Sequence, residues 1–353
     1  MPRSGRPTAR SHRLRDIAEQ SGLSQATVDR VLHRRAGVSA RAVRAVEQAV
    51  LDLDRQQTQL RLGARTLVLD VVMQAPARFS GAVREALEAE LPAARPAVVR
   101  ARFDLRESAD PAAAVAALDA VGTRGRTSHG VLLKAPDHPD VAAAARRLRA
   151  RGIPVVTLVT DVRDSQRVAY IGLDNAAAGA TAAYLLSRWL EGREGDVLLT
   201  LSRSAFFGER ERAEAFEQTL DRLDPGRDVH VVADSDGLDE ALGALVTEAL
   251  ARHPAACAVY SVGGGNRATV AAFRAAGRRC AAFVGHDLDQ DNVELLRAGA
   301  LSAVLHHDLN ADMRRAIRQV LRHHRLLPGA PTSVPANVEV VTPYNLPARL
   351  LPD

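Results

Sequence analysis

The stretch "LRDIAEQSGLSQATVDRVLHRRAGVS", residues 14–39, decides the fold of the N-terminal part of the chain. Apolar side chains recur at three- and four-residue steps on both sides of Gly22, which predicts two short helices joined by a turn. Glycine adopts the left-handed conformation that such a turn needs, and Ser24 can cap the second helix, which we expect to end at Leu32. A third amphipathic helix is predicted from Ser39 to Leu53.

The basic residues are concentrated in the same region. Residues 1–65 hold 13 arginines and 6 acidic residues, a balance of +7. The remainder holds the other 34 of the 47 basic residues and 36 of the 42 acidic ones, a balance of −2. This asymmetry is typical of a small nucleic-acid module joined to a near-neutral domain, whereas a solvated arginine-rich tail would explain only residues 1–13.

The opening stretch resembles the DNA-binding headpiece of the LacI-type (lactose-repressor) transcription regulators. The resemblance implies that Gln25 and Ala26 open a recognition helix in the major groove, with Arg30 one turn further along. Glutamine can bond adenine, alanine can touch a thymine methyl, and arginine can bind guanine. The matching positions, which run without a gap, are Asp16, Ala18, Ser21, Gly22, Leu23, Ser24, Thr27, Val28, Arg30, Val31, Leu32, Val38 and Ser39.

Three positions around that helix have less direct roles. Ser24 and Thr27 are expected to contact phosphate or to cap the helix. Asp29 departs from the family, which has serine there, and a carboxylate is unfavourable beside phosphate. It could orient Arg30 or accept a hydrogen bond from a cytosine amine. The alternative for the whole module is a helical edge that docks against protein.

The segment behind the headpiece, residues 56–66, is interpreted as a linker. In the family a hinge helix inserts a leucine into the minor groove, and Leu60 or Leu62 could supply it. This link lacks the family's tyrosine, proline and asparagine, and it is several residues short. Asp52 and Asp54 are also poor neighbours for phosphate. A hinge helix and a plain polar linker both stay open.

From Thr66 onward, apolar β-rich runs alternate with alanine-rich amphipathic stretches, which predicts parallel sheets covered on both faces. The expected fold is an all-α helix-turn-helix headpiece (1–55) followed by an α/β domain (67–353) with two doubly wound lobes. Ligands in such folds bind beyond the carboxyl ends of the strands. Strands are predicted at 67–73, 98–103, 130–135, 153–159, 168–173, 196–201, 228–233, 256–262, 280–286 and 301–306, and helices at 79–91, 138–151, 175–191, 209–222, 238–252 and 265–277.

The segments "YIGLDNAAAGATAAYLL", "FFGERERAEAFEQTL", "SVGGGNRATVAAFRAAG" and "FVGHDLDQDNVELLRAG" resemble periplasmic sugar-binding proteins and the LacI-type effector domain. The resemblance implies a small polar effector, a sugar or polyol, bound between the lobes. An aspartate and an arginine can satisfy several hydroxyls, and an aromatic ring can cover a sugar face. The implied contacts are Arg212, Asn266, Asp287 and His307, with Phe79, Phe206 or Phe207 as the aromatic platform.

Each of these assignments has a structural alternative. Arg212 could pair with Glu209 or Glu211 on a solvated helix, and Asp287 could cap the next helix. Phe79 could belong to the core. Asp174 and Asn175 are interpreted as helix caps rather than ligand contacts.

No pattern in the chain indicates an enzyme, a cofactor or a metal ion. The "GGGN" run at 263–266 lacks phosphate-loop spacing, the histidine pairs lack a third ligand, and there is no G-x-S-x-G elbow. Cys257 and Cys280 suit small buried side chains in a reducing compartment. The basic N-terminus precedes no apolar segment, and no run approaches the roughly 20 residues that span a bilayer.

These observations predict a cytoplasmic, homodimeric regulator that binds a double-stranded DNA operator and responds to a sugar or polyol. Repression is the outcome usual in the family, and nothing in the residues excludes activation. The alternatives are a sugar-binding protein without a DNA partner and a sugar-modifying enzyme with a fused helical module.

Overall fold

The computed structural model describes residues 12–61, 65–107, 109–202, 206–235 and 239–347. The chain separates into two compact units, Met1–Leu67 with Glu90–Arg100, and Val68–Ala89 with Ala101–Asp353. The first unit contains the predicted headpiece, and the second contains most of the predicted α/β domain. Among the described helices, none is both long enough and apolar enough to cross a membrane.

The headpiece has the three helices that the sequence predicts, α1 (Leu14–Ser21), α2 (Gln25–Leu32) and α3 (Ala40–Arg61). Gly22 ends α1 with φ 67°, the left-handed conformation expected of the turn. The Ser24 side chain caps α2 by accepting a hydrogen bond from the backbone of Thr27 at 3.2 Å. The buried core consists of Ile17, Ala18, Val28, Val46, Ala49 and Val50.

Helix α3 is longer than predicted. It continues past Leu53 to Arg61 because residues 54–61 contain neither glycine nor proline and consist mostly of arginine, glutamine and leucine, which are good helix formers. The backbone of the expected linker, residues 56–66, is therefore helical at its start. The groove-wedging role assigned to Leu60 or Leu62 falls on side chains outside the described residues, so it stays a prediction.

The α/β domain forms two sheets, and the ten predicted strands are all present. The first sheet has the order β2-β1-β3-β4-β5 and the second β11-β10-β9-β8-β6-β7. Read from β7, the second sheet repeats the order of the first, so the lobes are two copies of one doubly wound plan. Their strands are β1 (Thr66–Gln74), β2 (Val98–Arg106), β3 (Gly130–Lys134), β4 (Val155–Leu158), β5 (Ala169–Ile171), β6 (Asp196–Ser202), β7 (Val229–Ser235), β8 (Ala256–Ser261), β9 (Ala282–His286), β10 (Ala303–His306) and β11 (Glu339–Val341).

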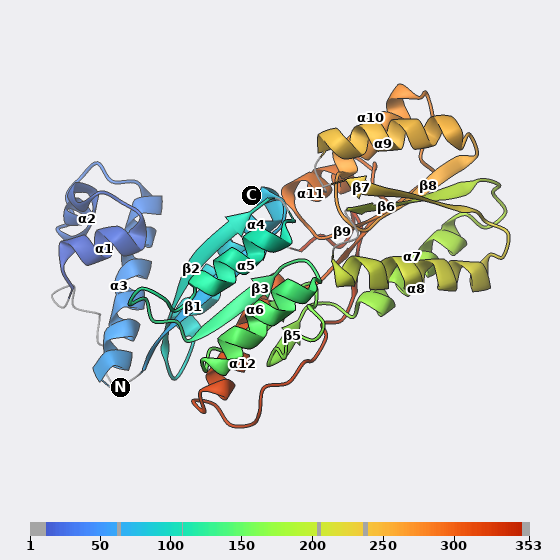
Figure 1. Cartoon of the computed structure of the whole chain (residues 1–353). Coiled ribbons are helices and arrows are strands. Elements are labelled where there is room, and N and C mark those ends of the chain that lie inside the picture. The colour runs from blue at the N-terminus through green and yellow to red at the C-terminus, as the bar shows by residue number, and fades with distance from the viewer. Residues whose placement is uncertain (1–11, 62–64, 108, 203–205, 236–238, 348–353) are drawn as a thin grey trace. The chain divides into compact units, whose positions relative to one another are not determined.

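Helices cover the sheets as the alternating pattern predicts. In Figure 1, α7 and α8 lie on one side of the second sheet and α9 and α10 on the other. The helix α12 follows β10 of the second lobe but packs against β4 and β5 of the first. The helices are α4 (Ala77–Glu90), α5 (Pro111–Ala120), α6 (Pro139–Ala150), α7 (Asn175–Trp189), α8 (Phe207–Leu223), α9 (Asp239–Arg252), α10 (Asn266–Ala275), α11 (Gln290–Arg297) and α12 (Leu309–His323), with a 3-10 turn at Leu91–Ala93.

The strand β11 was not predicted. It adds to the edge of the second sheet by pairing antiparallel with β10, Val304 opposite Val341. The chain reaches it from the first lobe, and a bridge between Leu173 and Ala336 marks the crossing. The chain thus crosses between the two lobes at several places. Connections of this kind can act as a hinge about which the lobes move.

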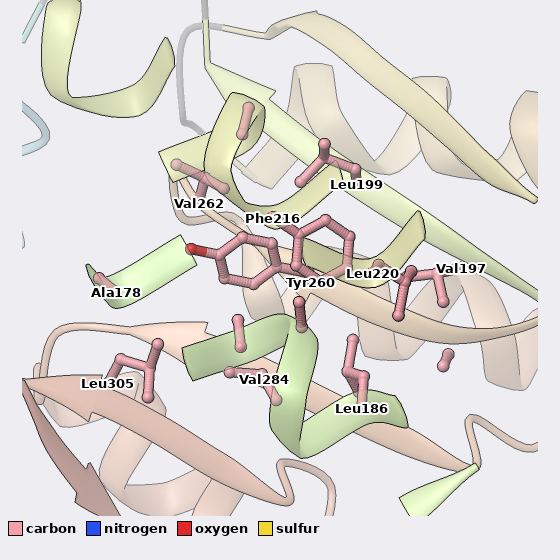
Figure 2. Packing of buried hydrophobic residues seen from close by; sticks show 14 of the residues in the cluster. Ala178, Leu186, Val197, Leu199, Phe216, Leu220, Tyr260, Val262, Val284 and Leu305 are labelled. Atoms are coloured by element: carbon pink, nitrogen blue, oxygen red, sulfur yellow. The ribbon is translucent and has the colours of Figure 1, made fainter. Parts of the chain in front are cut away.

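Buried aromatic residues organise the core of the second lobe (Figure 2). Phe216 of α8 and Tyr260 of β8 have ring centroids 4.6 Å apart, an arrangement that adds roughly 0.5–1.5 kcal/mol to the burial itself. The Tyr260 hydroxyl is hydrogen-bonded to His286 Nε2 at 2.8 Å. This core therefore fixes α8 and the end of β9, both of which carry candidate ligand residues.

Candidate functional site

The first turn of α2 presents the predicted DNA-contacting residues to solvent. Ser24, Gln25 and Ala26 are exposed, and Thr27 is half-buried beneath them. Arg30 is exposed one turn later, where its Nη2 donates to the carbonyl oxygen of Ala36 at 3.2 Å. That bond uses one of five guanidinium N–H groups, so the side chain keeps donors for a base edge.

Asp29 does not orient Arg30. Its carboxylate pairs with Arg35 at 3.2 Å and lies 2.9 Å from His33 Nδ1. Neighbouring positions on a helix point in different directions, so Asp29 and Arg30 cannot face each other. The pairing offsets the negative charge that made Asp29 an unfavourable neighbour of phosphate. The Asp52 carboxylate is likewise kept away from DNA phosphates, because Asp52 is buried and accepts a hydrogen bond from Gln48.

The second unit contains a cleft with about 760 Å³ of empty space, counting its solvent-open mouth. Its walls come from both lobes, mainly from the end of β3 and from the segments that follow β1, β4, β6, β8 and β9. This is where ligands bind in doubly wound sheets. Among the residues predicted to contact the effector, the cleft brings together Phe79, Phe206, Arg212, Asn266 and Asp287.

Arg212 is buried rather than solvated. It is 4% exposed, and its Nε donates to Asn175 Oδ1 at 2.8 Å. Pairing with Glu209 or Glu211 is therefore not its role. Asn175 does not cap α7: the cap is Asp174, which accepts from the backbone of Ala177 at 2.9 Å.

Asp287 directly follows β9 with φ 64°, a conformation uncommon for residues other than glycine. Helix α11 is capped by Asp289, which excludes the capping alternative for Asp287. The Oδ1 atom of Asp287 is buried and has no hydrogen-bond partner among the described residues. Such an acceptor suits a ligand that supplies a donor.

His307 lies behind Asp287 and is not among the lining residues. It is 1% exposed, its Nε2 is 3.7 Å from Asp287 Oδ1, and its Nδ1 is hydrogen-bonded to Asp312. The hydrogen bond from His307 and the charge of Arg315 outweigh burial and lower the pKa of Asp312. The structure thus gives His307 a supporting position in place of the direct contact that the resemblance implied.

Asn266 supplies a second acceptor without a partner. It begins α10 directly after the glycine run, and its Nδ2 donates to Asn292 Oδ1 at 2.7 Å. This bond fixes the amide so that its Oδ1 is left buried and unpartnered among the described residues. His286 lies beside it, and burial holds the pKa of His286 well below its usual range, so the ring is neutral.

Lys134, at the end of β3, lines the cleft but was missed by sequence reasoning. Its Nζ donates to the Gln74 carbonyl oxygen at 3.0 Å and lies 3.7 Å from the centroid of the Phe206 ring. Burial lowers the pKa of Lys134 to about 8. A usable signal exists: Lys134 is the chain's only lysine, against 46 arginines among 47 basic residues, and it directly follows an apolar strand.

Three polar contacts join the lobes near the cleft. Arg78 of α4 pairs with Asp289 at 2.9 Å, and Arg210 of α8 pairs with Asp137 at 2.8 Å. The backbone N–H of Gly208 donates to Thr160 Oγ1 at 3.0 Å. In the described structure these three contacts therefore hold the two lobes together. The part of the chain that is described contains no cluster of three or more histidine, cysteine or acidic side chains that could hold a metal ion.

Two family models match the chain. Residues 71–324 match the periplasmic binding protein domain, and residues 13–54 match the bacterial regulatory proteins of the lacI family. No curated protein matches the sequence significantly.

Similar solved structures share the fold of the second unit. A solute-binding protein of a Burkholderia graminis transporter, in complex with D-arabinose, has a TM-score of 0.71 at 20% identity, covering 81% of this chain and 98% of its own. A second, from Agrobacterium vitis with α-D-tagatopyranose, scores 0.71 at 17% identity, covering 80% and 96%. A Bacteroides fragilis protein described as a LacI transcriptional regulator scores 0.69 at 14% identity, covering 80% and 98%.

The headpiece match and the two-lobed match lie in the order and at the places where the structure has a helix-turn-helix and a pair of doubly wound lobes. The chain therefore belongs to the family of the periplasmic binding protein domain, and it carries in front of that domain a headpiece that matches the lacI family of bacterial regulatory proteins.

Proposed function

We propose that this protein is a sequence-specific transcription regulator whose affinity for its DNA operator is controlled by a sugar or polyol bound in the cleft between the lobes. One observation carries the proposal. A single chain combines an exposed helix-turn-helix with a ligand cleft in which Phe79, Arg212, Asn266 and Asp287 converge.

The headpiece supports operator binding through base contacts and phosphate contacts. Gln25, Ala26 and Arg30 are the proposed base-reading residues, and Ser24 and Thr27 the proposed phosphate contacts. Two headpieces in a homodimer would read two half-sites of a palindrome. We propose dimerisation, repression and a cytoplasmic site of action on this basis.

The cleft supports binding of a hydroxyl-rich ligand. Two buried acceptors, Asp287 Oδ1 and Asn266 Oδ1, receive no hydrogen bond from any described residue, and Phe79 and Phe206 offer aromatic surface. The sugars in the arabinose and tagatopyranose complexes occupy proteins of the same fold, which favours a related ligand here. The ligand can alter operator affinity only if it binds one lobe arrangement more tightly than another. The ion pairs Arg78–Asp289 and Arg210–Asp137 join the two lobes in the described structure. We propose this closed arrangement of the lobes as the one that binds the ligand more tightly.

The experiment has two parts. Selection of random DNA by the full-length protein should yield a palindromic site, and binding to it should weaken steeply as salt rises. Thermal-shift screening against sugars and polyols should find a stabilising ligand, since binding to the native state raises stability. Absence of any sequence preference would reject the regulator. Chemical conversion of the ligand by the purified protein would instead favour an enzyme.

A further inference from the structure

We propose that the effector is an acidic sugar, a polyol that carries one carboxylate, and that Lys134 binds this carboxylate while Asp287 and Asn266 bind hydroxyls. This inference rests on the proposed function, because it names the ligand class of the same cleft. Lys134 is a buried cation that lines this cleft and forms no contact ion pair with any described residue.

Lys134 is 8% exposed, and within the described residues it forms no ion pair. Its ammonium group has three N–H donors, and the Gln74 carbonyl accepts one. The Phe206 ring adds only a cation–π contact. Because Lys134 lines the cleft, a bound ligand can reach the remaining donors. A buried charge without a partner is costly, so an anionic group on the ligand would be strongly favoured there.

The acidic groups of the cleft do not neutralise Lys134. The charges of Glu209 and Asp287 raise its pKa, but burial and the charge of Arg212 oppose them, and the net pKa is lowered. Glu209 Oε2 accepts from the backbone N–H of Ser202, and Asp287 faces His307. Asp289 is paired with Arg78. Glu209 and Asp289 thus have partners of their own, whereas Asp287 has only His307 nearby, and none of the three forms a contact ion pair with Lys134 among the described residues.

Arg212 adds a second cation without a contact ion pair among the described residues. Of its nitrogens, Nε donates to the neutral Asn175 amide, and the terminal nitrogens donate to no other described residue, so their donors stay available to a ligand. One carboxylate matches the cleft better than a phosphate does. A phosphate carries about −1.5 to −2 charges and would meet Glu209 and Asp287 in the same space.

The single lysine permits a direct test on the full-length protein. Expression with ¹³Cε-lysine gives one lysine signal, whose shift with pH reports the protonation of Lys134. Without ligand, the midpoint should fall near 8. D-Glucuronate, D-galacturonate and D-gluconate are the acidic probes, and D-glucose, D-galactose and myo-inositol are the matched neutral ones. An acidic probe that binds should raise the midpoint by about one unit or more, because its charge favours the ammonium form.

Thermal shift with the same probes decides between the ligand classes. Stabilisation by an acidic probe, with the raised lysine midpoint, supports the inference. In Lys134→Met the affinity for that acid should fall about 30-fold or more, the usual effect of removing one partner of a buried charge pair. Stabilisation by neutral probes alone, with the midpoint unchanged or lowered, overturns the acidic class and leaves the proposed function standing. Failure of all three acids to bind also overturns it, whereas loss of operator selectivity would instead remove the proposed function.

Discussion

The backbone of Gly179 on α7 lies against that of Arg212 on α8 so closely that a Cβ atom on Gly179 would come within 2.1 Å of the Arg212 carbonyl oxygen. The same Cβ would also be 3.0 Å from the backbone nitrogen of Phe216. Both neighbours are backbone atoms, so neither can move aside alone. This approach fixes how far α8 lies from α7 and therefore where Arg212 enters the cleft.

Gly179→Ala should consequently push α8 away from α7. We expect a loss of roughly 1–3 kcal/mol in the free energy of unfolding, the usual range for overpacking, and weaker ligand binding because Arg212 is displaced. Chemical denaturation measures the first effect and ligand titration the second. The matched control is Gly81→Ala, also within a helix, where a Cβ would meet nothing within 4 Å. The control should be neutral or stabilising by up to about 1 kcal/mol. Equal effects of the two substitutions would contradict the close approach.

Asp287→Asn should weaken ligand binding without harming the fold. Asparagine tolerates the positive φ of 64° at this position, so the substitution removes the charge and keeps the backbone. We expect the ligand dissociation constant to rise about 30-fold or more, while the melting temperature of the free protein is unchanged or higher. Asp164→Asn is the control, since Asp164 has φ 57° but is exposed and does not line the cleft. Undiminished affinity in Asp287→Asn would remove Asp287 from the site.

Much of the fold was predictable from local patterns in the sequence. The turn at Gly22 and the cap at Ser24 follow from short-range backbone preferences, and the ten strands follow from apolar runs long enough to be distinctive. The strand β11, which is no shorter than β5, was missed because its position depends on antiparallel pairing with β10, which is far away in sequence. The packing of α12 on the first lobe is likewise determined by tertiary contacts, which the spacing of apolar residues along the sequence does not reveal.

The residues of the candidate ligand site also divide into those that local sequence patterns reveal and those that depend on tertiary contacts. Residues at strand ends, such as Asp287, could be named because parallel strands bring their carboxyl ends together. The burial of His307 behind Asp287 depends on Asp312, which comes from the first turn of α12. Lys134 was missed because a lysine after a strand is usually solvated, and only the three-dimensional structure shows that it is buried beneath Phe206.

Lys134→Met should make the free protein more stable at neutral pH. The folded pKa of about 8 lies below the ordinary 10.5, so the unfolded chain binds the additional proton between these values. Wild-type stability relative to the variant should therefore rise with pH from about 8 to 10.5, by up to roughly 3 kcal/mol. Urea denaturation of both proteins at pH 7 and pH 10 measures this. A stability difference that is the same at both pH values would show that Lys134 is not a costly buried cation.

Arg30→Ala should relax base preference more than it weakens overall DNA binding. Loss of a base contact costs about 1–3 kcal/mol at one operator position, whereas loss of a phosphate contact weakens all sequences alike. Binding to the selected operator and to single-base variants of it measures the difference. Arg222→Ala, which removes an exposed arginine from α8, should leave every affinity unchanged. A uniform loss across all DNA sequences would make Arg30 a phosphate contact.

A regulator of the proposed kind requires coupling between ligand binding in the cleft and DNA binding by the headpiece. The most direct test is the operator affinity of the full-length protein, measured by fluorescence anisotropy with and without the sugar or sugar acid that stabilises it. Coupling free energies between such sites are typically about 1–3 kcal/mol, so the operator dissociation constant should change about 5- to 150-fold at saturating ligand. Asp287→Asn should bind the operator normally and lose this response. An operator affinity that is identical with and without saturating ligand would contradict the central claim.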